Sequence, residues 1–337
     1  MASEQMQVFL EGLKTQPKKV KAGSIEQQRA AHVRLFLVLL DVQAVGPRVE
    51  LPVHAPEVVA RTKQAGGHVR PQIAGRPIVV QIMLTEPGPF ANVPSFVEVL
   101  ALEPAARTAK YRDPEWRARA EREIYDAWGD IVDRARVSES RQHIELVGGE
   151  GLGAIAASRG TTAFQLMIDL ALEEDLATRF HVPMTNDNED QIASMLNDDH
   201  LLLGLSDAGA HTSQLCDADF ATYLLQHWWR ERGTISLEKA IWRLTGQPAG
   251  FLGLEGRGHL APGAAADVVA FDPQTVGARP AERVFDLPTG ADRLIARSTG
   301  IEHVWVAGRA IRRGGEDLPG AGPESPGRVL RPMRKGH

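Results

Sequence analysis

The sequence predicts an α/β protein, with parallel strands that alternate with helices as in a β/α barrel and a separate β-rich segment after them. Residues 201–205, Leu-Leu-Leu-Gly-Leu, form an apolar run without polar alternation, as is typical of a strand buried on both faces of a parallel sheet. Segments with apolar residues at helical spacing flank this run. Beyond Gly253 the pattern changes to short Val- and Ile-rich runs between Pro- and Gly-rich turns, which predicts strands.

Helical signals lie on both sides of the predicted strand. Residues 113–128 begin with Asp-Pro, a capping residue followed by a residue that favours the first helical turn. Residues 161–174 and 188–196 are expected to form further helices before the strand, and residues 219–232 and 237–245 to form helices after it. The expected apolar face of the helix at 161–174 consists of Phe164, Met167, Ile168 and Ala171.

The N-terminal part of the chain contains a segment with two interpretations. Residues 24–41 begin with a Ser cap and predict a helix, whereas the crowding of apolar residues into 33–40 equally predicts a buried strand. Residues 56–66 predict a helix between a Pro and a Gly, and residues 68–72 predict a barrel strand.

The β-rich segment covers residues 254–314 and is expected to lie outside the barrel. Its apolar runs at Asp267–Phe271 and Ile301–Val306 predict two strands of one sheet. Val304–Ile311 predicts a hairpin with Gly308 in the turn.

Composition excludes several classes of protein. The chain has 337 residues, of which 43% are hydrophobic and 24% charged, and its net charge of −5 gives no basis for binding nucleic acid. Its longest apolar run, Leu35–Leu40, is far too short to span a bilayer, and the polar start lacks the layout of a signal peptide. The single cysteine, Cys216, excludes an internal disulfide and fits a reducing compartment. We therefore expect a cytoplasmic protein without a nucleic-acid or membrane partner.

The first candidate site residue is Asp207, which follows the buried run directly. Residues 208–210, Ala-Gly-Ala, then allow a tight turn before His211. In a β/α barrel the carboxyl ends of the strands carry the chemistry, so Asp207 is placed where a metal or a reacting water could meet it. The alternative is that Asp207 is a turn residue that caps the next segment.

The stretch Ser-Asp-Ala-Gly-Ala-His at 206–211 resembles the last barrel strand of the amidohydrolase superfamily, and within it the N-acyl-D-amino-acid deacylase (D-aminoacylase-like) branch. The resemblance begins near Val69, with Val-Arg-Pro-Gln, and includes the Asp-Pro-x-x-Arg element at 113–117. Several motifs in order make it more specific than any one of them. They occupy residues 215–217, 234–240, 243–249 (Arg-Leu-Thr-Gly-Gln-Pro-Ala) and 257–273.

The resemblance implies a domain organisation. Residues 51–253 would form a partial (β/α)8 TIM-like barrel of the metal-dependent hydrolase type, and residues 254–314 a small C-terminal β-sandwich segment. Residues 1–50 are unassigned, and residues 315–337 are expected to be a tail. A full barrel takes about 250 residues, so the barrel segment looks like the later part of a deacylase that lacks its first strands.

The chemistry implied by the resemblance is hydrolysis of a linear amide C–N bond, which converts an N-acyl-D-amino acid and water into a D-amino acid and a carboxylate. A divalent metal, usually Zn²⁺, would lower the pKa of a bound water and polarise the scissile carbonyl. Asp207 matches the carboxylate that takes the proton of the water and passes it to the leaving amine, and it is also an expected metal ligand. His211 either orients Asp207, contacts substrate, or is an ordinary loop histidine.

The metal-ligand set departs from the family pattern. Members carry a His-x-His pair at the end of the first strand, and this sequence contains none. A zinc site needs about three protein ligands; besides Asp207, His54 is the upstream histidine in a strand-end setting. His68 is expected to face solvent, and His143 and His181 to lie on loops. The isolated chain is therefore expected to bind zinc weakly and to hydrolyse little substrate.

Three hypotheses follow from these observations. The chain is a metal-dependent deacylase that acts on a small N-acyl amino acid, as a monomer or a homo-oligomer. Alternatively, it is a truncated, catalytically inactive relative that serves as a binding or oligomerisation subunit. A third possibility is an amidohydrolase of cyclic amides. Bound metal per chain separates the first from the second.

Two further patterns are interpreted as structural. The Gly-x-Gly-x-x-Ala at 149–154, between an expected strand and a helix, fits a dinucleotide fingerprint, but the helix from Leu152 runs into another at Thr161 without the parallel strand that such a fold needs. NAD binding is therefore not expected. Trp228 and Trp229 lie at helical spacing with Leu224 and Leu225 and are expected to pack in the core.

Overall fold

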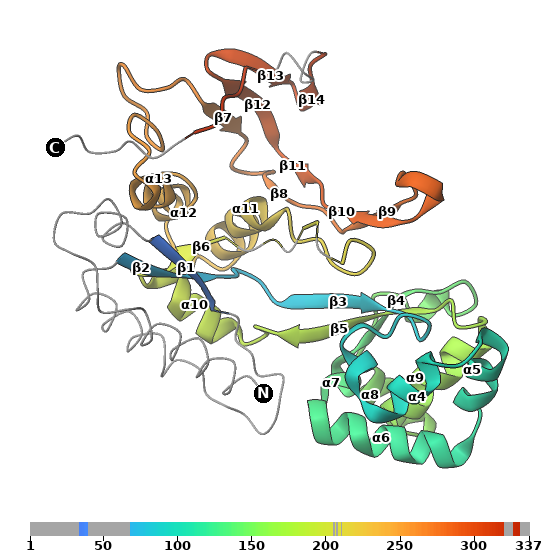
Figure 1. Ribbon diagram of the computed structural model, residues 1–337. Coiled ribbons are helices and arrows are strands. Elements are labelled where there is room, and N and C mark those ends of the chain that lie inside the picture. The colour runs from blue at the N-terminus through green and yellow to red at the C-terminus, as the bar shows by residue number, and fades with distance from the viewer. Residues whose placement is uncertain are drawn as a thin grey trace, which may run out of the picture.

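A small parallel sheet comes before the candidate site along the chain (Figure 1). The computed structural model describes residues 34–39, 68–204, 206, 208–209, 211–319 and 326–330. The described strands of the sheet are β1 (Arg34–Leu39), β2 (His68–Ile73) and β6 (Leu202–Leu203), in the order β1-β2-β6. Both β1 and β6 run parallel to β2, with Gln72 opposite Leu202. The strand predicted at 68–72 is confirmed, and the strand alternative holds for 34–39.

Strand β6 is shorter than the apolar run that predicted it. Leu202 and Leu203 are buried, and the N–H of Gly204 adds one more bond, 3.1 Å long, to the carbonyl of Ile73. Leu205 lies outside the described residues. The apolar run therefore predicted the position of the strand and its place in a parallel sheet, but not the residue at which the strand ends.

The parallel sheet packs against helices that lie before and after β6 in the chain. Ile73 and Leu203 share a hydrophobic cluster with α10 (Glu189–Asn197) and with a π-helix over Leu224–Glu231. Trp228, in this π-helix, is fully buried, and its indole N–H donates to the carbonyl of Gly75. The packing role predicted for the Trp228-Trp229 pair is confirmed.

Along the chain, the segment between β2 and β6 forms an antiparallel sheet that the sequence analysis did not predict. It consists of β3 (Ile78–Ile82), β5 (Arg179–Thr185) and β4 (Arg136–Glu139), in the order β3-β5-β4. Figure 1 shows β3 and β5 as a ladder that leads away from the parallel sheet. His181, expected on a loop, lies within β5. That expectation was wrong because the partner strand β3 is remote in the sequence.

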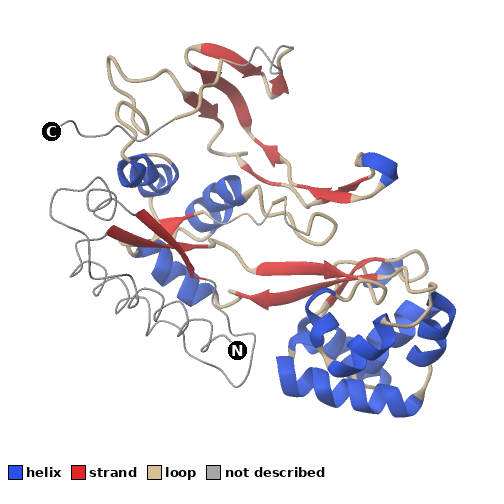
Figure 2. Ribbon diagram, viewed as in Figure 1, coloured by secondary structure: helices blue, strands red, loops and turns tan. Residues whose placement is uncertain are grey.

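Helices gather at the far end of this ladder, as Figures 1 and 2 show. They enclose the largest hydrophobic cluster among the described residues. In it, the ring centroid of Phe96 lies within 6.5 Å of those of Tyr111, Trp116 and Phe164. Such edge-to-face and tilted pairs stabilise aromatic cores. These helices are α4 (Pro94–Leu100), α5 (Pro104–Tyr111), α6 (Pro114–Trp128), α7 (Ile131–Arg134), α8 (Leu152–Arg159) and α9 (Ala163–Glu173), and a 3₁₀ turn over Gly88–Asn92 precedes them.

Local capping explains the bounds of the best-predicted helices. The Asp113 carboxylate accepts bonds from the N–H groups of Glu115 and Trp116 at the start of α6, and Gly129 follows its end with φ 60°. The Thr162 hydroxyl caps α9 by accepting a bond from the N–H of Gln165. The predicted helix at 161–174 is confirmed, and its predicted apolar face is buried. That face consists of Phe164, Met167, Ile168 and Ala171.

The Gly-x-Gly-x-x-Ala stretch does not open a dinucleotide-binding unit. The strand expected before it is a 3₁₀ turn over Ile144–Leu146. After α8 and α9 the chain enters β5, which is antiparallel to both of its neighbours. The parallel βαβ arrangement that places a pyrophosphate on a helix N-terminus is therefore not formed.

Helices also follow β6. They are α11 (Phe220–Tyr223), the π-helix Leu224–Glu231, α12 (Leu237–Leu244) and α13 (Gly246–Leu252). The helices predicted at 219–232 and 237–245 are confirmed, although most of the first is a π-helix. None of the described helices is long and apolar enough to cross a membrane.

The C-terminal segment is β-structure, as predicted. Strands β7 (Val268–Phe271) and β12 (Ile301–Val306) pair in one antiparallel sheet of order β14-β13-β12-β7, with β13 (Arg309–Arg313) and β14 (Glu316–Asp317). Gly308 lies in the turn between β12 and β13 with φ 79°, which confirms the predicted hairpin. Two smaller antiparallel pairs precede it in the chain: β8 (Gly277–Ala278) with β11 (Ser298–Thr299), and β9 (Glu282–Val284) with β10 (Arg293–Ile295).

Candidate active-site loop

The candidate site is the loop that follows β6, residues 206–219, called the site loop below. Asp207 and Ala210 within it, and His54 upstream, lie outside the described residues. His211 is exposed and has a φ of 49°, in the left-handed region that residues other than glycine rarely adopt. The site loop therefore makes a tight, defined turn at the histidine that the sequence singled out.

Arg76 ties the end of the site loop to the neighbouring strand. It lies just after β2 and forms ion pairs with Asp219, at 2.6 Å, and with Asp217, at 3.4 Å. Its guanidinium also lies 4.7 Å from the centre of the Tyr223 ring. The N–H of Asp217 donates to the carbonyl of Ser206 over 2.9 Å, which closes the loop on itself.

Three consecutive carbonyls of the site loop accept bonds from remote strands. The N–H of Leu294, on β10, donates to Thr212 over 2.8 Å, and the N–H of Gln81, on β3, donates to Gln214 over 2.7 Å. Between them, the Arg283 guanidinium donates to Ser213 over 3.2 Å. The site loop is thus held between the antiparallel sheet on one side and the β9–β10 pair on the other.

Arg283 also belongs to a half-buried charge cluster. Its side chain is 9% exposed and pairs with Glu139, at 2.9 Å, and with Asp292. Arg179 pairs with the same two carboxylates, at 3.4 and 3.2 Å. Burial and the nearby Arg283 lower the pKa of Arg179, while the two carboxylates raise it.

His181 faces the same cluster from β5. Crowding by protein atoms lowers the pKa of His181, Glu139 opposes this shift and Arg283 reinforces it, although the side chain keeps a solvent-exposed surface. His143, by contrast, lies on a loop as predicted, with its ring 2.7 Å from the Glu173 carboxylate. The structure therefore brings neither histidine into the site loop.

Arg243 and Gln247, from the motif at 243–249, support the start of β6. Arg243 is fully buried and donates to the carbonyl of Leu201 over 2.6 Å, and Gln247 donates to the same carbonyl over 2.8 Å. Arg243 also donates to the carbonyls of Met195 and Leu196, at 2.7 and 3.0 Å, at the end of α10. Burial lowers the pKa of Arg243, and Asp199 and Asp198 oppose this shift. The motif fixes the approach to the site loop.

The described residues do not fit a metal ion by themselves. Among them, no three His, Cys, Asp or Glu side chains come together in a way that could hold one. The two ligands expected from the resemblance, Asp207 and His54, lie outside the described residues. No step of the chemistry is therefore derived through a metal.

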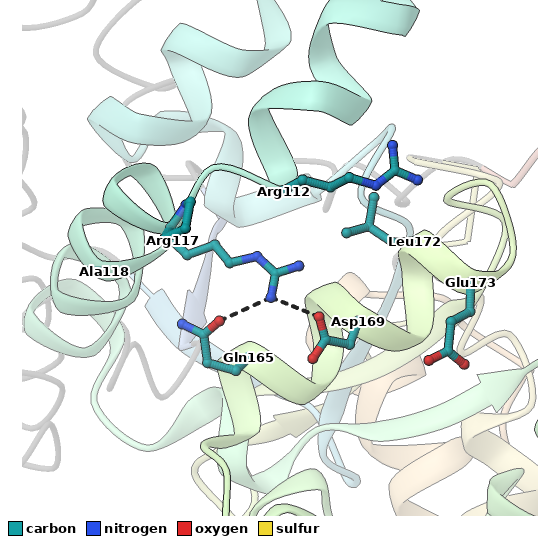
Figure 3. A pocket seen from close by; sticks show the side chains of 8 residues that line it. Arg112, Arg117, Ala118, Gln165, Asp169, Leu172 and Glu173 are labelled. Carbon is teal, nitrogen blue, oxygen red and sulfur yellow. Dashed lines mark hydrogen bonds and ion pairs between the residues drawn. The ribbon is translucent and has the colours of Figure 1, made fainter.

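A surface cavity of about 650 Å³ is lined by residues between Arg112 and Glu173, from the helices α6 and α9 and the turn before α6 (Figure 3). None of these residues belongs to the site loop. Arg117 reaches into the cavity, where it forms an ion pair with Asp169 at 2.7 Å and donates a hydrogen bond to Gln165 over 3.2 Å. Its Nε donates to the carbonyl of Tyr111 over 2.6 Å. The Asp-Pro-x-x-Arg element is thus structural, with Asp113 as the cap of α6 and Arg117 as a link to α9.

Residues 115–312 match the model of a family described as the amidohydrolase family. This match covers more than half of the chain and includes β6, the site loop and the motif at 243–249. The chain belongs to the amidohydrolase family. The family resemblance expected from the site-loop motif is confirmed.

Among curated proteins, this amidohydrolase is 35% identical over 206 residues to the N-acyl-D-glutamate deacylase of Alcaligenes xylosoxydans xylosoxydans. The alignment covers 60% of this chain and 37% of that protein. It is 32% identical over 165 residues to the D-aminoacylase of the same organism, in an alignment that covers 48% of this chain and 31% of that protein. The chain therefore spans about a third of the length of the curated relatives that it matches.

Solved structures of similar enzymes show weaker likeness. A zinc complex of the N-acyl-D-glutamate deacylase of Bordetella bronchiseptica with a phosphonate inhibitor aligns with a TM-score of 0.43 and 23% identity, over 85% of this chain and 48% of that chain. A D-aminoacylase structure concerned with the role of its binuclear metal centre aligns with a TM-score of 0.43 and 22% identity, over 85% of this chain and 48% of that chain.

Proposed function

We propose that this amidohydrolase hydrolyses the linear amide C–N bond of N-acyl-D-amino acids and releases a D-amino acid and a carboxylate. The observation that carries the proposal is the site loop, which follows a parallel strand at its carboxyl end, where β/α folds carry their chemistry. The curated relatives named above, a deacylase of N-acyl-D-glutamate and a D-aminoacylase, support the substrate class.

In this proposal Asp207 takes a proton from the attacking water and passes it to the leaving amine. A positioned carboxylate of this kind contributes about 10²–10⁴-fold to rate. His211, in the same loop, orients Asp207 or contacts substrate. The parallel strands β2 and β6 would belong to a partial (β/α)8 barrel over residues 51–253, with β1 pairing with β2 from the unassigned segment before it, and residues 254–314 would form the small β-sandwich.

The proposal includes a divalent metal, with Zn²⁺ as the first candidate. When bound, such a metal lowers the pKa of a water and polarises a carbonyl. Asp207 and His54 are the proposed ligands, and because a zinc site needs about three, we expect weak binding. Asp207→Asn and His54→Ala, each compared with the unchanged chain in a zinc-binding titration, test this assignment.

The proposed activity is tested by following release of free amino groups from N-acetyl-D-glutamate with zinc added in excess. N-acetyl-L-glutamate is the matched substrate control, and Asp286→Asn is the matched protein control because Asp286 is paired with Arg293 at the surface. We expect weak turnover of the D-substrate, which Asp207→Asn removes and Asp286→Asn retains. Equal turnover by Asp207→Asn would refute the role given to Asp207.

A second candidate function is a catalytically inactive binding or oligomerisation subunit. The absence of any His-x-His pair from the 337-residue sequence favours it. An unchanged chain that shows no turnover at excess zinc, but forms a defined oligomer or binds N-acetyl-D-glutamate, would support this candidate over the first.

A further inference from the structure

The Arg283 guanidinium uses all three of its nitrogen atoms inside the protein. Nε donates to Glu139, Nη1 to Asp292 and to the carbonyl of Ser213, and Nη2 to Gln81 and to the same carbonyl. Because the side chain is 9% exposed, these partners replace nearly all of its contact with water. An arginine with a planar fork fixed on several sides can hold one main-chain oxygen in a defined place.

Two neighbours of Arg283 hold the adjacent carbonyls of the same loop. Leu294 lies opposite Arg283 in the β9–β10 pair, and its N–H donates to Thr212. Gln81 accepts a bond from Arg283 through its side chain and donates from its main chain to Gln214. Arg283, on β9, therefore bonds to the site loop between the two points at which β3 and β10 bond to it.

We infer that Arg283 is a positioning residue for the site loop, and that it fixes the backbone beside His211 by holding the Ser213 carbonyl. This inference rests on the proposed function, because only that function makes the site loop part of an active site. Its test does not depend on the proposed function. The inference assigns to a strand of the C-terminal segment a direct role in the geometry of the candidate active site.

Arg179 is a matched control that the chain itself provides. It pairs with the same two carboxylates as Arg283 and is similarly buried, with its side chain 14% exposed. Its ion-pair partners, Glu139 and Asp292, lie outside the site loop. Replacing either arginine by Met removes one ion pair to each of these carboxylates, but Arg283→Met also removes the bonds to Ser213 and to the Gln81 side chain.

The test uses histidine-selective NMR of the full chain, which needs no enzymatic activity. His211→Gln identifies the His211 signal among the 11 histidines. We expect Arg283→Met to shift that signal by more than its line width or to split it, and Arg179→Met to leave it in place at a comparable loss of melting temperature. Arg283→Lys, which keeps the charge but not the fork, should give an intermediate shift and serves if Arg283→Met does not fold.

Two outcomes would overturn the inference: an unchanged His211 signal in the Arg283 variants, or an equal change in the Arg179 and Arg283 variants. Where the unchanged chain turns over N-acetyl-D-glutamate, Arg283→Met should also lower kcat more than it changes KM. An inactive unchanged chain would count against the proposed function, while the NMR comparison would still decide the role of Arg283.

Discussion

Arg76 and Asp219 form an ion pair of 2.6 Å that joins the segments after two neighbouring parallel strands, β2 and β6. The Asp219 side chain is only 5% exposed, so this ion pair is largely shielded from water on the side of Asp219. The end of the site loop is thereby fixed to the sheet by charge, while its middle is fixed by main-chain bonds to β3 and β10.

Replacing Arg76 by Gln is expected to lower the free energy of unfolding by about 2–4 kcal/mol, because it leaves a buried carboxylate without its partner. Urea unfolding of the full chain measures this loss. The control is Arg297→Gln, since Arg297 is 56% exposed and pairs with Glu282 at the surface, where a loss below about 1 kcal/mol is expected. Similar losses in both variants would contradict the account.

Glu174 is predicted to make stability depend on pH. Burial raises the pKa of this carboxyl, but bonds donated by the Ser140 and Thr178 hydroxyls and by the N–H groups of Arg141 and Gln142 outweigh it and lower the pKa from 4.5 to about 2. A carboxyl whose pKa is lowered in the folded state stabilises the protein above its unfolded-state pKa, and this contribution is lost as the pH falls from 4.5 toward 2.

Glu174→Gln is expected to cost on the order of 2 kcal/mol at about pH 6 and less at about pH 3. Urea unfolding at the two pH values measures the difference. Glu173→Gln is the control, because Glu173 is 54% exposed and its carboxylate contacts His143. A cost for Glu174→Gln that stays constant between the two pH values would count against the lowered pKa.

Arg243→Met is predicted to destabilise the chain by about 3–5 kcal/mol, because it leaves the carbonyls of Met195, Leu196 and Leu201 with fewer donors in a buried region. Lys239→Met, on the same helix, is the control. Lys239 contacts Asp199 and the carbonyl of Asn197 near the surface, so a loss below about 1 kcal/mol is expected. A mild effect of Arg243→Met in thermal unfolding would refute the support assigned to this side chain.

Local sequence signals were sufficient for the elements whose bounds depend on neighbouring residues. The cap at Asp113 and the apolar spacing of Phe164, Met167 and Ile168 act within one helix, so the pattern predicted both α6 and α9. The pairing of β3 with β5 has no such local signal, because Val80 lies opposite Val182 across the intervening helices. The antiparallel sheet was therefore missed, and His181 was placed on a loop.

The candidate site divides in the same way. The run 201–205 predicted the strand from contiguous residues, and the motif after it singled out Asp207 and His211 as candidate site residues, which stay a prediction. Arg283 was missed because its partners Ser213 and Glu139 lie 70 and 144 residues away in the sequence. The role of Arg243 depends likewise on carbonyls at the end of α10 and the start of β6, which no pattern in its own motif reveals.

The central claim is that the site loop carries the proton-transferring carboxylate of a deacylase. It is tested most directly by the turnover of N-acetyl-D-glutamate by the unchanged full chain and by Asp207→Asn, each with zinc in excess and with zinc per chain measured after desalting. The account predicts zinc well below one equivalent after desalting, weak turnover that depends on added zinc, and a loss of at least about 100-fold in Asp207→Asn. Turnover that is the same in both proteins would contradict it.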